Sequence, residues 1–210
     1  SAPQYAHGVV DPIEEIGEIA LKRRVPFHVD GCFGGFILPF LEKLGHPLPV
    51  WDFRIPGVTS MSADVHKYGY APKGASVIVY RDMTLMRHQF FVSTDWPGGV
   101  YVSPTMQGTR PGGCIAGAWA SLMHMGESGY LELAQQALAA TAQLRGGLEA
   151  LSDVRVLGLG HSTIVTWRCE GVDTYAVADQ LAAKGWSVDR QQKPPSIHCT
   201  VNAANEPVIE

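Results

Sequence analysis

Cysteine is scarce in this sequence, with four residues in 210, and no two of them form a C-x-x-C pair. The four are Cys32, Cys114, Cys169 and Cys199. This spacing gives no support to a structural zinc site or a redox motif built on cysteine pairs. Scattered cysteines in a chain of this length predict reduced thiols in a cytosolic protein, without a disulfide framework.

Long apolar runs and an excess of positive charge are also missing. No stretch of about 18 apolar residues occurs, so no segment predicts a membrane-spanning helix. Residues 1–10 have neither the basic start nor the apolar core of a secretory signal. Lys and Arg number 16 against 20 Asp and Glu, which gives a formal charge of −4 and no basic field for nucleic acid.

What is present is typical of a globular domain, with 46% hydrophobic and 17% charged residues. A loop-like start at residues 1–3 and an apolar end at residues 207–209 make us expect a piece of a longer protein. No internal repeat is visible.

The first regular element that the pattern predicts is an amphipathic helix over residues 12–24, with Asp11 as its N-cap and Pro12 at its first position. A short buried strand over 26–29 follows and ends at Asp30. A helix, a strand and a polar strand end are typical of an α/β sheet, which binds ligands beyond the carboxyl ends of its strands.

Two further strands are predicted over residues 58–61 and 75–80. Residues 92–113, rich in Gly, Pro, Thr and Ser, predict a long irregular segment of the kind that often serves function or an interface. Helices are expected over 116–125 and 130–151.

The pattern changes near residue 153. Short strands and a single helix then alternate, which is typical of a smaller α+β unit. The expected elements are strands over 154–157, 163–167 and 186–188, and a helix over 172–184.

Lys67 occupies an unusual position for a surface lysine, directly after His66 at the end of a predicted strand. Desolvation lowers the pKa of a lysine, and the neutral amine can attack an aldehyde. By itself this motif also fits an ordinary solvated loop lysine.

Asp30 adds a second element of the same chemistry. Pyridoxal 5'-phosphate (PLP) withdraws electrons only while its pyridine nitrogen is protonated, and a carboxylate can hold that proton. An Asp before a Gly equally fits a turn or a helix cap. A strand-end Asp together with a strand-end Lys, however, forms a constellation that predicts PLP binding.

The segments HVDGCFGGF (28–36) and SADVHKYGYAPKG (62–74) resemble the PLP-dependent decarboxylase family, and its sphingosine-1-phosphate lyase branch in particular. The similarity extends from residue 1 to about residue 198. Shorter matching segments are Asp52–Arg54, Thr94–Trp96, Ser103–Thr105, Arg110–Gly113 and Pro194–His198.

The resemblance implies a fold class and a domain division. The fold would be that of the α/β PLP-dependent transferases, fold type I. Residues 1–152 would be part of the PLP-binding large domain with its mostly parallel sheet, lacking an N-terminal portion. Residues 153–210 would begin the small α+β C-terminal domain.

The resemblance also implies roles for residues that hold the cofactor. Lys67 would bind PLP as an imine and Asp30 would pair with the pyridine nitrogen, which makes these two the catalytic residues. Cys32 would lie near one face of the ring, and His66 near the phosphate. Thr109 stands where many relatives have Ser, and its hydroxyl can make the same hydrogen bond.

Further roles concern the substrate and a second subunit. Lys73 and Tyr5 match positions at the substrate end of the site, with Lys73 facing the substrate phosphate. Gly108 and Thr109 would reach the phosphate of PLP in the other subunit of a homodimer with shared active sites. The family's glycine-rich phosphate loop and its stacking histidine precede residue 1.

Three functions remain open at this level. The first is a carbon–carbon lyase that cleaves a phosphorylated sphingoid base, sphingosine 1-phosphate, to a long-chain aldehyde and phosphoethanolamine. The second is an amino-acid decarboxylase, and the third a non-catalytic fragment of the same fold. Lys73 favours the first. The location would be the cytoplasm, or the cytosolic face of a membrane if the full protein has an N-terminal anchor.

A metal site is the remaining alternative. His28 and Asp30, like Asp64 and His66, are spaced two apart, and such residues project from the same side of a strand. The spacing is too short to be specific, so we expect no metal.

Overall fold

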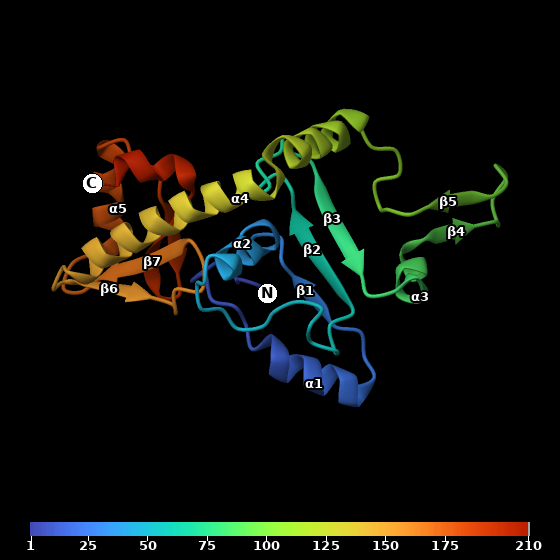
Figure 1. Cartoon of the computed structure of the whole chain (residues 1–210), viewed down its shortest axis with the longest axis horizontal. Helices are drawn as coiled ribbons and strands as arrows, with labels where there is room; N and C mark the ends of the chain where they lie inside the picture. The colour runs from blue at the N-terminus through green and yellow to red at the C-terminus, as the bar shows by residue number, and fades with distance from the viewer. Residues whose placement is uncertain (210) are drawn as a thin grey trace.

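A three-stranded sheet lies at the centre of the first part of the chain in the computed structural model, which describes residues 1–209 (Figure 1). Its strands, in spatial order, are β1 (His28–Asp30), β2 (Ser60–Asp64) and β3 (Ser76–Tyr80). β1 and β2 run parallel, with Asp30 opposite Ser62. The predicted α/β class is therefore confirmed, and the carboxyl ends of β1 and β2 lie side by side.

β3 runs antiparallel to β2, so the sheet formed by the described residues is mixed. The reason is the connection over residues 65–75, which contains turns and no helix. A parallel pairing would need a longer crossover between the two strands.

Helix α1 (Ile13–Arg23) confirms the predicted amphipathic helix and buries Ile13, Gly17 and Ala20. Its predicted cap is wrong. Pro12 takes the N-cap position and no side chain caps the helix. The Asp11 carboxylate instead contacts the amino nitrogen of Ser1.

The core around the sheet is built from buried apolar side chains of the first 68 residues, joined by two from later elements. η1 (Gly34–Phe36) and α2 (Leu38–Lys43) cover it. Its fully or nearly fully buried members include Val29, Leu38, Leu41, Val58, Tyr68, Ala134 and Ile164.

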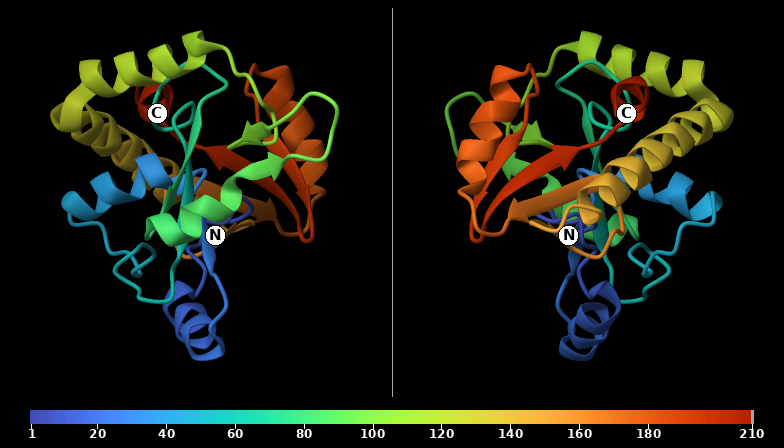
Figure 2. Two further views of the ribbon diagram at one scale, coloured as in Figure 1. Left: turned by 90° about the vertical axis from the view of Figure 1, so that its right-hand side faces the viewer. Right: turned by 90° about the vertical axis from the view of Figure 1, so that its left-hand side faces the viewer.

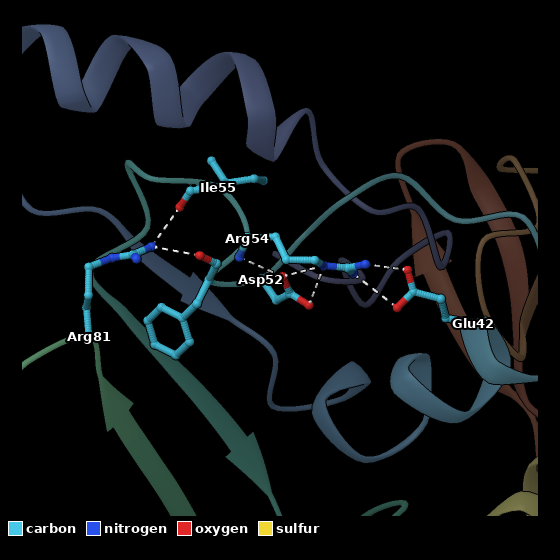
Figure 3. A network of polar contacts seen from close by, with 6 residues as sticks. Glu42, Asp52, Arg54, Ile55 and Arg81 are labelled. Atoms are coloured by element: carbon cyan, nitrogen blue, oxygen red, sulfur yellow. Dashed lines mark hydrogen bonds and ion pairs between the residues drawn. The ribbon is translucent and has the colours of Figure 1, made fainter.

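Arginine contacts fix the loop between α2 and β2, where one of the family-like segments lies (Figure 3). Arg54 donates to both carboxylate oxygens of Glu42 and to Asp52, and Arg81 donates to the carbonyls of Phe53 and Ile55. The half-exposed ion pairs contribute little stability by themselves. Arg81 donates hydrogen bonds to carbonyl groups that have no partner in a strand. These contacts give the segment Asp52–Arg54 a structural role.

Helix α4 (Gly112–Glu149) includes the two predicted helices and runs from the first sheet to the second (Figure 1). The two expected helices meet at a kink at Gly126, where φ is 56° and ψ is −175°. Such a backbone conformation suits glycine, which has no Cβ. α1 and α4 lie at opposite edges of the molecule (Figure 2).

The segment over residues 92–113 is not wholly irregular as predicted, because it includes most of a β-hairpin, β4 (Phe91–Ser93) and β5 (Tyr101–Ser103). α3 (Met83–Met86) and η2 (Arg87–Gln89) precede it. The hairpin projects from the rest of the molecule (Figure 1). Large apolar side chains on it are exposed, Val100 to 72%.

A four-stranded antiparallel sheet forms the last part of the chain, in the order β6-β7-β9-β8. It packs with α5 and the end of α4 around buried Val165, Trp167, Ala178 and Ile197. The elements are β6 (Val154–Leu157), β7 (Ile164–Cys169), α5 (Thr174–Ala183), β8 (Asp189–Gln192), β9 (Pro195–Thr200) and η3 (Ala203–Val208).

Part of this sheet departs from prediction. β6, β7 and α5 are confirmed, but residues 186–188 form no strand, and β8 and β9 were not predicted. β8 has the polar sequence DRQQ, which does not favour a strand locally. β9 pairs with β7 on one side and with β8 on the other, so its pairing extends the sheet to β8.

The division near residue 153 remains a proposal. The second sheet has its own core, yet Ile164 packs in the first one. Thr166 also donates to the carbonyl of Ala6 at 2.6 Å. None of the helices within residues 1–209 is long and apolar enough to cross a membrane.

Gly57→Ala should reduce the free energy of unfolding by about 1–3 kcal/mol, because overpacking costs this much. A Cβ on Gly57 would lie 2.0 Å from the backbone oxygen of Gly17 in α1. Gly146→Ala is the matched control, since its Cβ would meet nothing within 4 Å. It should raise stability by up to about 1 kcal/mol through helix propensity. Denaturant unfolding of both variants checks this, and a neutral Gly57→Ala would contradict the packing.

Candidate active site

The candidate site lies where β1 and β2 end and the chain turns away from the sheet. Asp30 is the last residue of β1 and Asp64 the last of β2. Lys67 follows in a turn closed by hydrogen bonds from its own amide to the Asp64 carbonyl and from the Tyr70 amide to the Lys67 carbonyl. Parallel pairing thus brings two distant polar segments to one edge of the sheet.

Buried anchors hold this turn on both sides. The Tyr68 hydroxyl donates to the carbonyl of Val201 at 2.6 Å and lies 2.5 Å from the Thr163 hydroxyl. The Tyr130 hydroxyl donates to the carbonyl of Gly69 at 2.8 Å. The position of Lys67 therefore depends on the second sheet and on α4.

Asp30 is held as an ionised carboxylate. Its Oδ1 accepts hydrogen bonds from the Cys32 amide at 2.9 Å and from the Ser62 hydroxyl at 3.1 Å. Partial burial acts to raise the pKa of Asp30, but these hydrogen bonds and the nearby His28 together lower it below its ordinary value. Both of these hydrogen bonds fall on Oδ1, so Oδ2 is the oxygen suited to a further donor.

Lys67 is held as an ammonium. Its Nζ lies 2.9 Å from Asp64 Oδ2 and 3.3 Å from Cys32 Sγ. Burial acts to lower the pKa of Lys67, but the contacts with Asp64 and Cys32 outweigh it and raise the pKa above the ordinary lysine value. The sequence left open a desolvated or a solvated lysine and did not identify the Asp64 carboxylate as the partner of Lys67.

Cys32 links the two key residues, because its amide contacts Asp30 and its sulfur contacts Lys67. Burial and the neighbouring Asp30 raise the pKa of the Cys32 thiol, despite the opposing influence of Lys67. The thiol is thus neutral near pH 7.

Tyr5 approaches the site from the N-terminal segment. It lines a cavity of about 400 Å³ with Phe33, Lys67, Tyr68, Tyr70, Thr200 and Asn202. Its hydroxyl donates to Asp189 Oδ2 at 2.8 Å, and its ring stacks on that of His198 with centroids 4.3 Å apart. Burial and Asp189 raise the pKa of Tyr5, so the phenol is a proton-bearing donor.

His66 faces a different cavity. This space, of about 490 Å³, lies between β3 and the start of α4 and is also lined by Ser76, Gln107 and Arg110. The His66 Nδ1 lies 2.7 Å from the carbonyl oxygen of Ala75. Lys67 and His66, adjacent in sequence, therefore line separate cavities.

Lys73, Gly108 and Thr109 neither line the Tyr5 cavity nor contact Lys67. The side chain of Lys73 is exposed in the loop before β3. Gly108, with φ of 67°, and Thr109 lie in the loop between the hairpin and α4. The structure thus brings together Tyr5, Asp30, Cys32 and Lys67, and leaves Lys73, Gly108 and Thr109 apart from them.

Two contact residues were missed as site residues. Asp64 was considered only as a metal ligand, although its place three residues before Lys67, at a strand end, could have identified it. Asp189 could not be found, because it is 184 residues from Tyr5 and no motif marks it.

The metal alternative gains no support from the geometry. The two ring nitrogens of His28 lie 2.9 Å and 3.2 Å from the hydroxyls of Ser60 and Ser62. Within residues 1–209 no three His, Cys, Asp or Glu side chains gather as metal ligands.

The residues present fit a pyridoxal cofactor. A primary amine can bond to its aldehyde, an ionised carboxylate can hold a proton on its ring nitrogen, and aromatic walls border the cavity beside the amine. Comparison with known proteins gives the same answer: residues 5–169 match the family described as pyridoxal-dependent decarboxylase conserved domain. The chain belongs to this family.

Curated relatives with similar sequences are sphingosine-1-phosphate lyases. That of Arabidopsis thaliana is 46% identical over the whole chain, and sphingosine-1-phosphate lyase 1 of Rattus norvegicus is 48% identical over 94% of it. The chain covers 39% and 35% of these two proteins. It therefore corresponds to little more than a third of such a relative.

Solved structures place the fold. A sphingosine-1-phosphate lyase of Burkholderia pseudomallei matches 98% of this chain with a TM-score of 0.93 and 42% identity, over 47% of its own chain. A glutamate decarboxylase of Lactobacillus brevis matches 98% with a TM-score of 0.80 and 22% identity, over 50% of its own chain. The predicted PLP-dependent fold is confirmed.

Proposed function

We propose that this chain is part of a PLP-dependent carbon–carbon lyase that cleaves sphingosine 1-phosphate to a long-chain aldehyde and phosphoethanolamine. The observation that carries the proposal is the proximity of Asp30, at the end of β1, and Lys67, in the turn after β2, both of which contact Cys32. The identity of 46% and 48% to sphingosine-1-phosphate lyases supports this substrate class.

The cofactor, when bound, supplies an electron sink for the bond that breaks. Lys67 supplies the amine that bonds to the cofactor aldehyde, and Asp30 keeps a proton on the ring nitrogen. Cys32 fixes the relative position of these two groups. In the overall cleavage, the bond between Cα and Cβ breaks, the β-hydroxyl loses its proton, and Cα gains one.

Tyr5 lies at the substrate end of the site in this proposal. Its single hydroxyl proton is donated to Asp189, so its oxygen can accept a hydrogen bond from the substrate. Asp189 holds the ring of Tyr5 against His198. Lys73, exposed and outside the cavity, would meet the substrate phosphate as a cation.

A decarboxylase on the same scaffold is the second candidate, favoured by the family's description. The same electron sink serves both reactions, and the orientation of the substrate decides which bond breaks. Product analysis separates them, since only the lyase releases a long-chain aldehyde and only the decarboxylase releases carbon dioxide.

A homodimer with shared sites is the assembly that we propose. The hairpin β4–β5 projects with exposed apolar side chains, and Gly108 and Thr109 follow it. A two-fold partner could bury this arm and receive Thr109 and Gly108 beside its own His66 and the cofactor phosphate.

The four free thiols support a reducing cytosolic setting.

Lys67→Ala should abolish the visible absorbance of bound PLP and all turnover, because no other amine can take its place beside Cys32. Lys22→Ala, an exposed lysine of α1, is the control and should change neither. Borohydride reduction of the full-length protein, followed by mass spectrometry, should find the cofactor on Lys67. Turnover by Lys67→Ala, or a reduced adduct on another lysine, would refute the proposal.

Lys73→Ala should raise the KM for sphingosine 1-phosphate at least about tenfold, the cost of losing roughly 1.4 kcal/mol of binding to the phosphate. The affinity for PLP should stay within about twofold, an energy difference well below 1 kcal/mol. Steady-state kinetics and cofactor titration of the full-length variant measure both. An equal loss of cofactor would assign Lys73 to the PLP site instead.

Two inactive full-length variants should complement each other in a shared-site dimer. Lys67→Ala lacks the amine, and Thr109→Asp places a carboxylate where it repels the cofactor phosphate. A heterodimer of the two has one site with both residues intact, so mixed subunits should regain part of the activity. Heterodimers that form but stay inactive would show that Thr109 acts within its own chain.

A further inference from the structure

Asp64 forms an ion pair with Lys67 that the proposed reaction does not require. Its Oδ2 lies 2.9 Å from Lys67 Nζ, and its side chain is 16% exposed against 36% for Lys67. The Ser76 hydroxyl, on the neighbouring strand β3, donates to Asp64 Oδ1 at 2.6 Å. The amide of Asp64 also donates to the carbonyl of Cys32.

These contacts fix the carboxylate more firmly than the lysine. Asp64 is held at the end of β2 by the sheet, by Ser76 and by its own amide, whereas Lys67 reaches it with a long flexible side chain. Burial acts to raise the pKa of Asp64, but Ser76 and Lys67 outweigh it and lower the pKa below the ordinary value. The carboxylate is therefore ionised near pH 7.

The other groups that face Lys67 do not compete as counter-ions. Cys32 and Tyr5 both have raised pKa values and are neutral near pH 7. Asp30 contacts Lys67 only through Cys32. His66 Nε2 lies 3.8 Å from Asp64 Oδ2 and so faces the same carboxylate, not the amine.

We propose that Asp64 is a positioning residue that holds Lys67 as an ammonium whenever the amine is not bonded to the cofactor. It thereby sets the pH range in which Lys67 can bond to the cofactor aldehyde. This inference rests on the proposed function of Lys67.

The step concerned needs a neutral amine. The nitrogen lone pair of Lys67 attacks the aldehyde carbon, the nitrogen loses its two hydrogens, and these leave with the aldehyde oxygen as water. A proton held on Lys67 by Asp64 blocks this attack. The same ion pair holds the lysine aside after a substrate amine has replaced it.

Asp64→Asn should speed up the uptake of PLP rather than slow it. The amide keeps the shape and can still accept from Ser76, but it removes the charge that favours the ammonium. Loss of this charge lowers the pKa of Lys67, so the neutral fraction of the amine at pH 7 rises. The rate of adduct formation at pH 7 should therefore rise several-fold, and its pH dependence should move to lower pH.

The experiment uses the full-length protein freed of its cofactor, mixed with PLP between pH 6 and 11 while the adduct absorbance is recorded. A free lysine derivative under the same conditions accounts for the titration of PLP itself. Asp64→Glu, which keeps the charge, should stay near the wild-type rate. Asp52→Asn, a matched change in the distant Arg54 network, should leave it unchanged.

The outcomes separate the two proposals. If the wild-type protein forms no adduct at any pH, the proposed function of Lys67 fails. If it does, but Asp64→Asn forms it at the wild-type rate with the same pH dependence, only the role of Asp64 fails. Should Asp64→Asn not fold, the wild-type curve decides: a rate that levels off below the ordinary lysine pKa overturns the inference, and a rate that still rises at pH 11 supports it.

Discussion

The parallel pairing of β1 with β2 is the constraint on which the rest of the site depends. It aligns Asp30 with Ser62 and brings two segments that are distant in sequence to one edge of the sheet. The core beneath fixes this register, because a slip of β1 by one residue would move the fully buried side chain of Val29 out of the core. The pairing therefore links the stability of the first core directly to the chemistry above it.

The two carboxylates of the site have different partners. The pKa values of Asp30 and Asp64 are both lowered, that of Asp30 mainly by Cys32 and Ser62 and that of Asp64 mainly by Ser76 and Lys67. Asp30 turns one oxygen to Cys32 and Ser62, and its other oxygen is suited to a cofactor nitrogen. Asp64 forms an ion pair with the Lys67 ammonium and compensates its charge. In the proposed mechanism only the first of these charges would serve the cofactor, and the second would govern when the lysine is reactive.

The second sheet contributes to the site, although no motif in its sequence indicates this. Tyr68 connects the Lys67 turn to Thr163 and Val201, and Asp189 of β8 holds Tyr5. A change in the packing of this sheet would therefore move both Tyr5 and the turn with Lys67, which line the same cavity. The site is thus shared by the two parts of the chain, and neither part alone would position Lys67 and Tyr5 together.

The sequence by itself determined the α/β class, the helix α1, the strand ends that carry Asp30 and Lys67, and the family, because these follow from local periodicity and short motifs. Only the tertiary structure decided the charge of Lys67, which depends on a 2.9 Å contact that no propensity encodes. The same holds for β8, whose residues do not favour a strand until it pairs with β9. Contacts across 184 residues, such as that of Tyr5 with Asp189, arise only when the chain has folded, since nothing local constrains them.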